Sequence, residues 1–117
     1  AGINKLGIYL VAEKSIVSPD IILAPATYRL SQNYPNPFNP TTSINYSLPV
    51  SGKTIVKVYN LLGMEIVTLV NSYQSPGDYR IQWNGIDNDG KLVSSGVYLY
   101  RIDSGSYQNN RKMVFVK

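Results

Sequence analysis

Short runs of alternating apolar and polar residues, each closed by glycine, proline, asparagine or aspartate, recur through most of this chain. Residues 42–48 show the pattern most cleanly, with Ile44, Tyr46 and Leu48 separated by polar residues. A repeat of two residues places successive side chains on opposite faces of a strand, so that one face can be buried. No segment repeats its apolar residues with the period of a helix over three turns. The alternation therefore restricts the fold to short β-strands.

The same alternation predicts a series of strands with turn sequences between them. The further predicted strands cover residues 28–31, 53–60, 64–70, 78–84, 97–103 and 107–116. The predicted turns are centred on Gly63, Pro76, Gly90 and Gly105. About seven short strands with regular turns are typical of an all-β, immunoglobulin-like antiparallel β-sandwich. We expect one such domain over residues 28–117, because 117 residues suffice for a single hydrophobic core.

Trp83 alternates with Tyr79 and Ile81 in the strand predicted over residues 78–84. This position favours a tryptophan in the core of the sandwich. The alternative is that Trp83, together with tyrosines, forms a platform on which a sugar ring stacks. A carbohydrate-binding module is therefore the third of three candidate functions.

A proline-rich segment lies between the first two predicted strands. Its residues are Asn33, Tyr34, Pro35, Asn36, Pro37, Phe38, Asn39 and Pro40. Proline fixes its own φ angle and favours an extended conformation in the residue before it. We expect a stiff, polyproline-like segment whose two aromatic residues, Tyr34 and Phe38, pin it to the domain.

The first 27 residues precede the predicted sandwich and differ from it. Residues 1–12 predict one strand, and residues 13–27 predict an extended linker or arm that contains Pro19 and Pro25. The apolar residues of the first strand are Ile3, Leu6, Ile8, Leu10 and Val11. Such a strand either belonged to a preceding domain or pairs with the open edge of a neighbouring sandwich. Repeated head to tail, the second arrangement builds a filament.

Several classes of function are disfavoured by the composition. The chain has no cysteine and no histidine, so it lacks thiolate metal ligands and the commonest general base. Asp87-Asn88-Asp89-Gly90 superficially resembles a calcium loop, but Lys91 and Tyr98 stand where such a loop needs oxygen ligands. We expect no enzymatic activity, no cofactor and no metal.

Nucleic acid is also disfavoured as a partner, and we expect no transmembrane segment. The net charge is +4, but the basic residues are scattered instead of forming a stripe. No apolar run approaches the 18 or more residues of a transmembrane segment.

One set of motifs resembles a known family. The set begins with residues 30–42 around the proline-rich segment and continues through residues 58–63, 77–79 and 95–98. It also includes Trp83, Gly85, Asp87, Gly90, Lys112, Met113 and the terminal Lys117. Together these residues resemble the type A C-terminal sorting domain of the type IX secretion system. They are also similar to the Ig-like domain of flagellar hook-capping proteins.

The resemblance implies a function and a location. Such domains are recognised in the periplasm by secretion machinery proteins of the outer membrane, and their cargo then reaches the surface of a Gram-negative-type bacterium. By resemblance, the recognition residues are Gly96, Val97, Tyr98, Lys112, Met113 and Lys117. The leading hypothesis is a secreted or surface-attached sorting domain, and the alternative is a filament subunit that donates residues 1–12.

Overall fold

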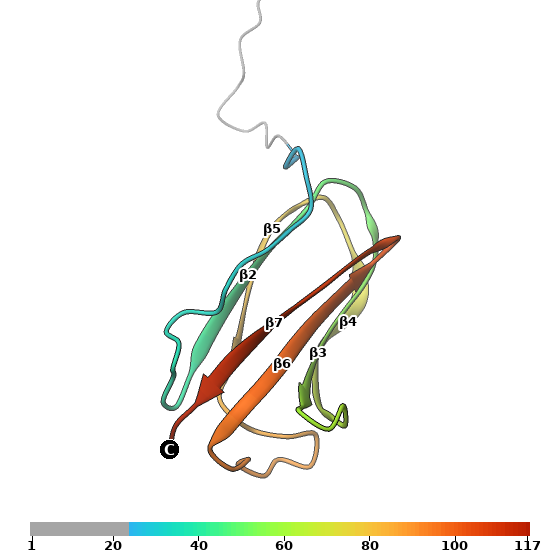
Figure 1. The fold of residues 1–117 in the computed structure, drawn as a ribbon. Coiled ribbons are helices and arrows are strands. Elements are labelled where there is room, and N and C mark those ends of the chain that lie inside the picture. Colours follow the sequence, from blue (N-terminus) through green and yellow to red (C-terminus); the bar gives the residue numbers. More distant parts are fainter. Residues whose placement is uncertain (1–23) are drawn as a thin grey trace, which may run out of the picture.

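Seven strands follow the alternation of the sequence in a computed structural model that describes residues 24–117. They are β1 (Arg29–Leu30), β2 (Thr42–Leu48), β3 (Gly52–Asn60), β4 (Glu65–Gln74), β5 (Gly77–Trp83), β6 (Gly96–Ser104) and β7 (Tyr107–Phe115). One sheet has the order β1-β2-β5 and the other the order β4-β3-β6-β7, with every pairing antiparallel. The two sheets lie face to face (Figure 1). The predicted Ig-like β-sandwich is confirmed.

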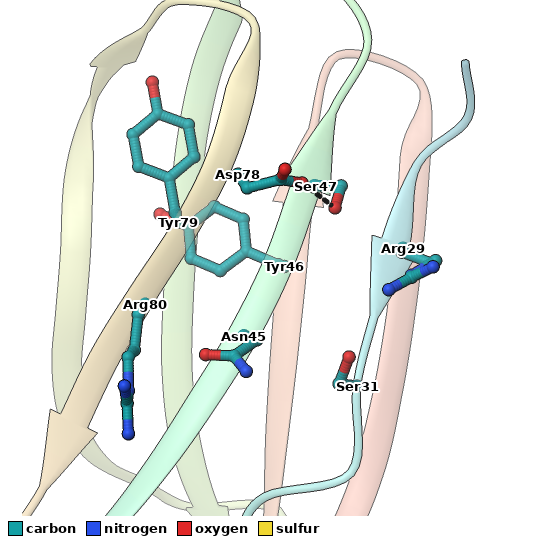
Figure 2. A pocket seen from close by; sticks show the side chains of 8 residues that line it. All are labelled: Arg29, Ser31, Asn45, Tyr46, Ser47, Asp78, Tyr79 and Arg80. Carbon is teal, nitrogen blue, oxygen red and sulfur yellow. Dashed lines mark hydrogen bonds between the residues drawn. The ribbon is translucent and has the colours of Figure 1, made fainter. Parts of the chain in front are cut away.

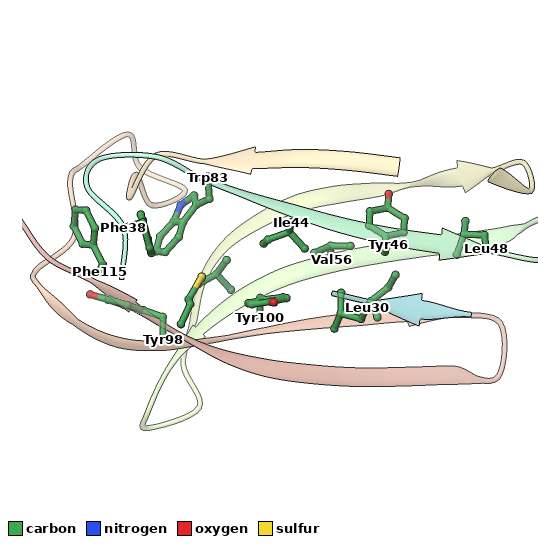
Figure 3. Close-up of a cluster of buried hydrophobic side chains, with 13 residues drawn as sticks. Leu30, Phe38, Ile44, Tyr46, Leu48, Val56, Trp83, Tyr98, Tyr100 and Phe115 are labelled. Atoms are coloured by element: carbon green, nitrogen blue, oxygen red, sulfur yellow. The ribbon is translucent and has the colours of Figure 1, made fainter. Parts of the chain in front are cut away.

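The core lies between the two sheets and comes from the apolar positions of the alternating strands. Figure 3 shows Ile44 and Tyr46 of the three-stranded sheet beside Val56 and Tyr100 of the four-stranded sheet. All four side chains are almost completely buried. Trp83 joins this cluster at one end, with only 2% of its surface exposed. The prediction of a core tryptophan is therefore confirmed, and Trp83 cannot serve as a sugar-stacking platform.

Strand β4 is longer than the sequence predicts. It continues past Val70 to Gln74, which pairs with Gly52 at the start of β3. Residues 71–73 are polar or aromatic and exposed, so they lack the alternation that identifies a half-buried strand. Pairing with the regular strand β3 holds them in the sheet. The hairpin predicted between β3 and β4 is confirmed.

The proline-rich segment differs from the prediction in two ways. We call residues 31–41 the strap. Phe38 is buried as predicted, but Tyr34 is 81% exposed, so the expectation that it pins the segment was wrong. The strap is also not a polyproline helix, because its main chain bends to reach both sheets. Tyr34 pairs with Ser43, and Phe38 pairs with Phe115. The peptide bonds before Pro35, Pro37 and Pro40 are cis.

The sandwich has two flanks, which are covered differently. On the β1/β7 flank, the strap lies along β7, where the Phe38 N–H donates to the Val114 oxygen at 2.9 Å. On the other flank, the loop that contains the predicted turn at residues 87–90 covers the start of β4. There the Asn88 N–H donates to the Ile66 oxygen at 3.0 Å. The turn itself is confirmed by the bond from Gly90 N–H to Asp87 oxygen, also 3.0 Å long.

The two ends of the sandwich carry different parts of the chain. Residue 24 lies at one end of the sandwich. The C-terminus lies at the opposite end, which is also the end where the β3–β4 hairpin turns (Figure 1). The strand predicted over residues 1–12 and most of the linker predicted over residues 13–27 lie outside the described residues. Across residues 24–117, no helix is long and apolar enough to cross a membrane.

Candidate interaction surfaces

The residues that the family resemblance assigns to recognition come together on the paired strands β6 and β7. Val97 pairs with Val114, Tyr98 with Met113, and Leu99 with Lys112. Because the side chains alternate, this pairing divides the set between the two faces of the sheet. Residue by residue, Gly96 and Val97 are half-buried, Tyr98 and Met113 are buried, and Lys112 and Lys117 are exposed.

The two buried members of the set have structural contacts. Met113 has no exposed surface, and the Tyr98 ring packs edge-on against Trp83 with 5.5 Å between the ring centres. The Tyr98 hydroxyl donates to the Ser94 oxygen at 2.6 Å. A partner that binds the folded domain can therefore reach Val97, Lys112 and Lys117 but not these two side chains.

The outer face of the four-stranded sheet extends this accessible surface. A shallow, open hollow of about 290 Å³ lies there, lined by Tyr59, Gly63, Leu99, Arg101 and Asn110. Leu99 pairs directly with Tyr59 on one side and with Lys112 on the other. The face therefore combines an apolar centre with the exposed cationic side chain of Lys112, which suits a protein partner.

Two ion pairs lie on the same sheet. Arg101 binds the carboxylate of Asp103 through two nitrogens, with distances from 3.1 to 3.3 Å, and this contact raises the pKa of Arg101. Lys57 Nζ lies 2.9 Å from Glu65 Oε1, which raises the pKa of Lys57 and lowers that of Glu65. Arg101, Lys57 and Glu65 therefore stay charged at neutral pH, and both pairs lie on strands next to the hollow.

The hairpin between β3 and β4 presents apolar side chains that sequence reasoning did not select as functional. Leu61, Leu62 and Met64 are all exposed, Leu62 to 84%. Asn60 holds the turn: its side-chain oxygen accepts the N–H groups of Leu62 and Met64 at 2.9 and 3.0 Å. Three large apolar residues in a tight turn are unusual, since turns are normally polar. The apolar composition of this turn was therefore the feature of the sequence that could have identified it as a candidate interaction site.

The family motif of the strap has a structural role in this fold. Phe38 packs against Phe115 and Trp83, with ring centres 5.0 and 5.7 Å apart. Asn33 is buried and donates to the Thr42 hydroxyl at 2.9 Å. The side chain of Asn36 accepts the Val114 N–H at 2.9 Å. These contacts join the strap to both sheets.

The outer face of the three-stranded sheet carries a polar pocket. Its lining residues are Arg29, Ser31, Asn45, Tyr46, Ser47, Asp78, Tyr79 and Arg80. Figure 2 shows Asn45 in the middle, between Ser31 on the β1 side and Arg80 on the β5 side. The Ser47 hydroxyl donates to Asp78 at 2.6 Å. Arg29 and Arg80 make no ion pair with the rest of residues 24–117.

Over the described part of the chain, no three acidic side chains gather closely enough to hold a metal ion. The arm residues Ile3, Leu6, Ile8, Leu10 and Val11 lie outside the described residues.

Comparison with known proteins agrees with this architecture. No curated protein matches the chain. Among solved structures, dimeric latent PorU from Porphyromonas gingivalis is similar over 80% of this chain, with 23% identity and a TM-score of 0.61. PorZ, an essential bacterial surface component of the type-IX secretion system of the same organism, is similar over 74% of this chain, with 21% identity and a TM-score of 0.53. The chain corresponds to 10% of the PorU structure and 11% of the PorZ structure.

The family model for the FlgD Ig-like domain matches residues 39–108, which is more than half of the chain. This range runs from the end of the strap through β2, β3, β4, β5 and β6 to the start of β7. The resemblance that the sequence motifs indicated is confirmed, and the chain belongs to the FlgD Ig-like domain family.

Proposed function

We propose that this chain is a non-enzymatic sorting and surface-attachment domain of a type IX-like secretion pathway. Two observations support the proposal. The sequence carries the motif set of type IX sorting domains in order, and the fold is similar to that of PorZ, a surface component of such a system. On this proposal the domain passes through the periplasm to the surface of a Gram-negative-type bacterium, and its partners are secretion machinery proteins of the outer membrane.

One observation indicates which surface of the domain would be recognised. The accessible residues of the recognition set, Val97 and Lys112, lie on neighbouring strands beside Leu99 and the hollow of the four-stranded sheet. The hairpin with Leu62 borders the same hollow through Gly63. We name this combined area the β6–β7 face. An apolar centre with a cationic rim can bind a partner surface that has apolar residues and acidic neighbours.

The test is an export assay. The 117-residue chain is fused to the C-terminus of a reporter protein in a bacterium that has a type IX system. We expect the reporter on the cell surface, and we expect Lys112→Glu combined with Leu99→Ser to retain it in the periplasm. The matched control is Lys53→Glu, which makes the same charge change on an exposed residue at the opposite end of the sandwich.

Retention of the wild-type fusion in the periplasm would refute the sorting function. Surface display that is unaffected by the double substitution would refute the β6–β7 face as its recognition site. Circular dichroism of each purified variant separates loss of recognition from loss of folding.

A structural subunit is the second candidate function. In this alternative, residues 1–12 of one copy add to a neighbouring sandwich and build a filament. The observation that favours it is that, among residues 24–117, β5 forms one edge of its sheet and pairs only with β2. Deletion of residues 1–26 should then abolish any assembly. An assembly that survives the deletion excludes this mode.

A further inference from the structure

Strand β5 is a sheet edge that nothing in the described chain covers. It pairs with β2 over its full length of seven residues, Gly77–Trp83. Within residues 24–117, no further main-chain hydrogen bond reaches its other side. Natural edge strands are usually protected by proline, bulges, covering loops or charged side chains, and of these β5 has only the charges of Asp78 and Arg80 within its length. Such an edge can accept another strand.

The hydrogen bonds of β2 establish which of its main-chain groups face away from β5. The Ser43 N–H and oxygen both bond to Tyr34 in the strap, and the Asn45 oxygen accepts the Ser31 N–H. Ser43 and Asn45 therefore direct their main-chain groups away from β5. Main-chain groups alternate in direction along a strand, so the neighbouring residues Ile44 and Tyr46 direct theirs toward β5.

This alternation carries over to β5. Tyr46 pairs with Tyr79, so Tyr79 uses its main-chain groups to bond β2. Asp78, Arg80 and Gln82 consequently direct their N–H and C=O groups toward the free edge. The same three residues have exposed side chains on the outer face of the sheet. The free edge thus offers main-chain hydrogen bonds at Asp78, which carries a negative charge, and at Arg80, which carries a positive charge.

We propose that β5 pairs antiparallel with β5 of a second copy of this chain, about a two-fold axis at Tyr79. In this register Asp78 lies opposite Arg80 of the second copy, and Arg80 lies opposite Asp78. Both pairs combine main-chain hydrogen bonds with opposite charges on one face. A register centred on Arg80 would instead place two arginines opposite each other. The pairing joins the two three-stranded sheets into one continuous sheet.

The surroundings of β5 suit a second copy better than the N-terminal arm. On the outer face, Asp78 is already oriented by the Ser47 hydroxyl at 2.6 Å, and Arg80 has no ion-pair partner among residues 24–117. The strand predicted over residues 1–12 has Lys5 as its one charged side chain and has no acidic side chain that could neutralise Arg80. On the inner face, half-buried Tyr79 lies opposite Tyr79 of the second copy, and half-buried Ile81 lies opposite Gly77 and diagonal to that tyrosine.

Sedimentation velocity of the full chain over a range of concentrations tests the proposal. We expect a monomer–dimer equilibrium. Arg80→Asp places aspartates opposite one another at two symmetric positions, so the dissociation constant should rise at least ~10-fold. The double variant Asp78→Arg with Arg80→Asp restores opposite charges and should recover most of the affinity. The control Arg29→Asp makes the same charge change on the same face, two strands away from the edge, and should leave the equilibrium within ~2-fold of wild type.

Hydrogen exchange gives a second measurement that does not depend on any substitution. The amides of Asp78 and Arg80 should exchange slowly only at concentrations where the dimer forms. A chain that remains monomeric up to ~1 mM overturns the proposal, since its affinity would then be weaker than the weakest specific complexes. A dimer that withstands Arg80→Asp but disappears on deletion of residues 1–26 also overturns it, and identifies the arm as the occupant of the interface.

Discussion

The hydroxyl of Tyr100, on β6, donates a hydrogen bond to the main-chain oxygen of Ser31, directly after β1, with 2.5 Å between the two oxygens. The bond runs from the four-stranded sheet to the three-stranded sheet, because β6 and β1 belong to different sheets. The Tyr100 side chain has no exposed surface. Burial is the main reason that the pKa of Tyr100 is raised to about 12. A neutral, buried hydroxyl therefore fastens the two sheets together.

Tyr100→Phe tests the contribution of this bond. The substitution keeps the ring but leaves the Ser31 oxygen without its donor, so the free energy of unfolding should fall by about 1–2 kcal/mol. Urea denaturation at pH 7 measures the change. Tyr73→Phe is the matched control, because Tyr73 is largely exposed and its loss of a hydroxyl should change the stability by less than ~0.5 kcal/mol. Equal effects of the two substitutions would contradict the role of Tyr100.

The raised pKa of Tyr100 predicts a loss of stability at alkaline pH. The ordinary tyrosine value is 10.0, so the unfolded chain gives up this proton before the folded chain does. The contribution of Tyr100 to the free energy of unfolding should be constant below pH 10 and should then be lost as the pH rises toward about 12. Tyr46, whose pKa burial also raises, adds to this slope. Tyr100→Phe should flatten the profile in that window, and an unchanged profile would show that another group is responsible.

Substitutions of the two aromatic residues of the strap should differ strongly in their effect on stability. Phe38 is buried among Trp83 and Phe115, so Phe38→Ala should destabilise the fold by about 3–5 kcal/mol. Tyr34 makes no comparable contact and is mostly exposed, so Tyr34→Ala should cost less than ~0.5 kcal/mol. Thermal and urea unfolding of both variants provide the comparison. A large loss of stability in Tyr34→Ala would show that Tyr34 does hold the strap to the domain, despite its exposure.

The contrast between these two residues shows what alternation can and cannot predict. The alternation in β2 predicts the burial of Ile44, Tyr46 and Leu48 because a strand period directly records which side faces the core. The strap has no such period. Its aromatic residues look equivalent in sequence, but only Phe38 is buried, and its burial depends on Phe115, which comes from the far end of the chain.

The candidate site could likewise be predicted only in part. Most of the residues that the motif resemblance selected lie on the paired strands β6 and β7, but the set groups buried Tyr98 and Met113 with accessible Val97 and Lys112. Motifs record similarity along the chain, whereas accessibility depends on the alternation of faces and on packing against Trp83. The hollow beside Leu99 could not be predicted at all, because it needs strands that are not adjacent in sequence.

Gly85 and Gly90 form a matched pair that separates backbone strain from steric overlap. Both have positive φ angles, 76° for Gly85 and 80° for Gly90. A Cβ atom on Gly85 would lie 2.9 Å from the Cζ atom of the buried Phe115 ring, whereas one on Gly90 would meet nothing within 4 Å. The first position therefore adds a clash to the conformational cost that the two positions share.

Alanine substitutions at these two glycines should therefore differ in their effect on stability. Gly90→Ala introduces only the strain of a left-handed backbone, which should lower the free energy of unfolding by about 1–2 kcal/mol. Gly85→Ala introduces the same strain and must also displace the ring of Phe115, so we expect a further loss of stability of about 1–3 kcal/mol. Urea unfolding measures both, and the near-ultraviolet circular dichroism of the Trp83 and Phe115 cluster should change only in Gly85→Ala. Equal losses in the two variants would mean that the ring moves aside freely, and that close packing of the 84–95 loop against Phe115 does not stabilise this end of the sandwich.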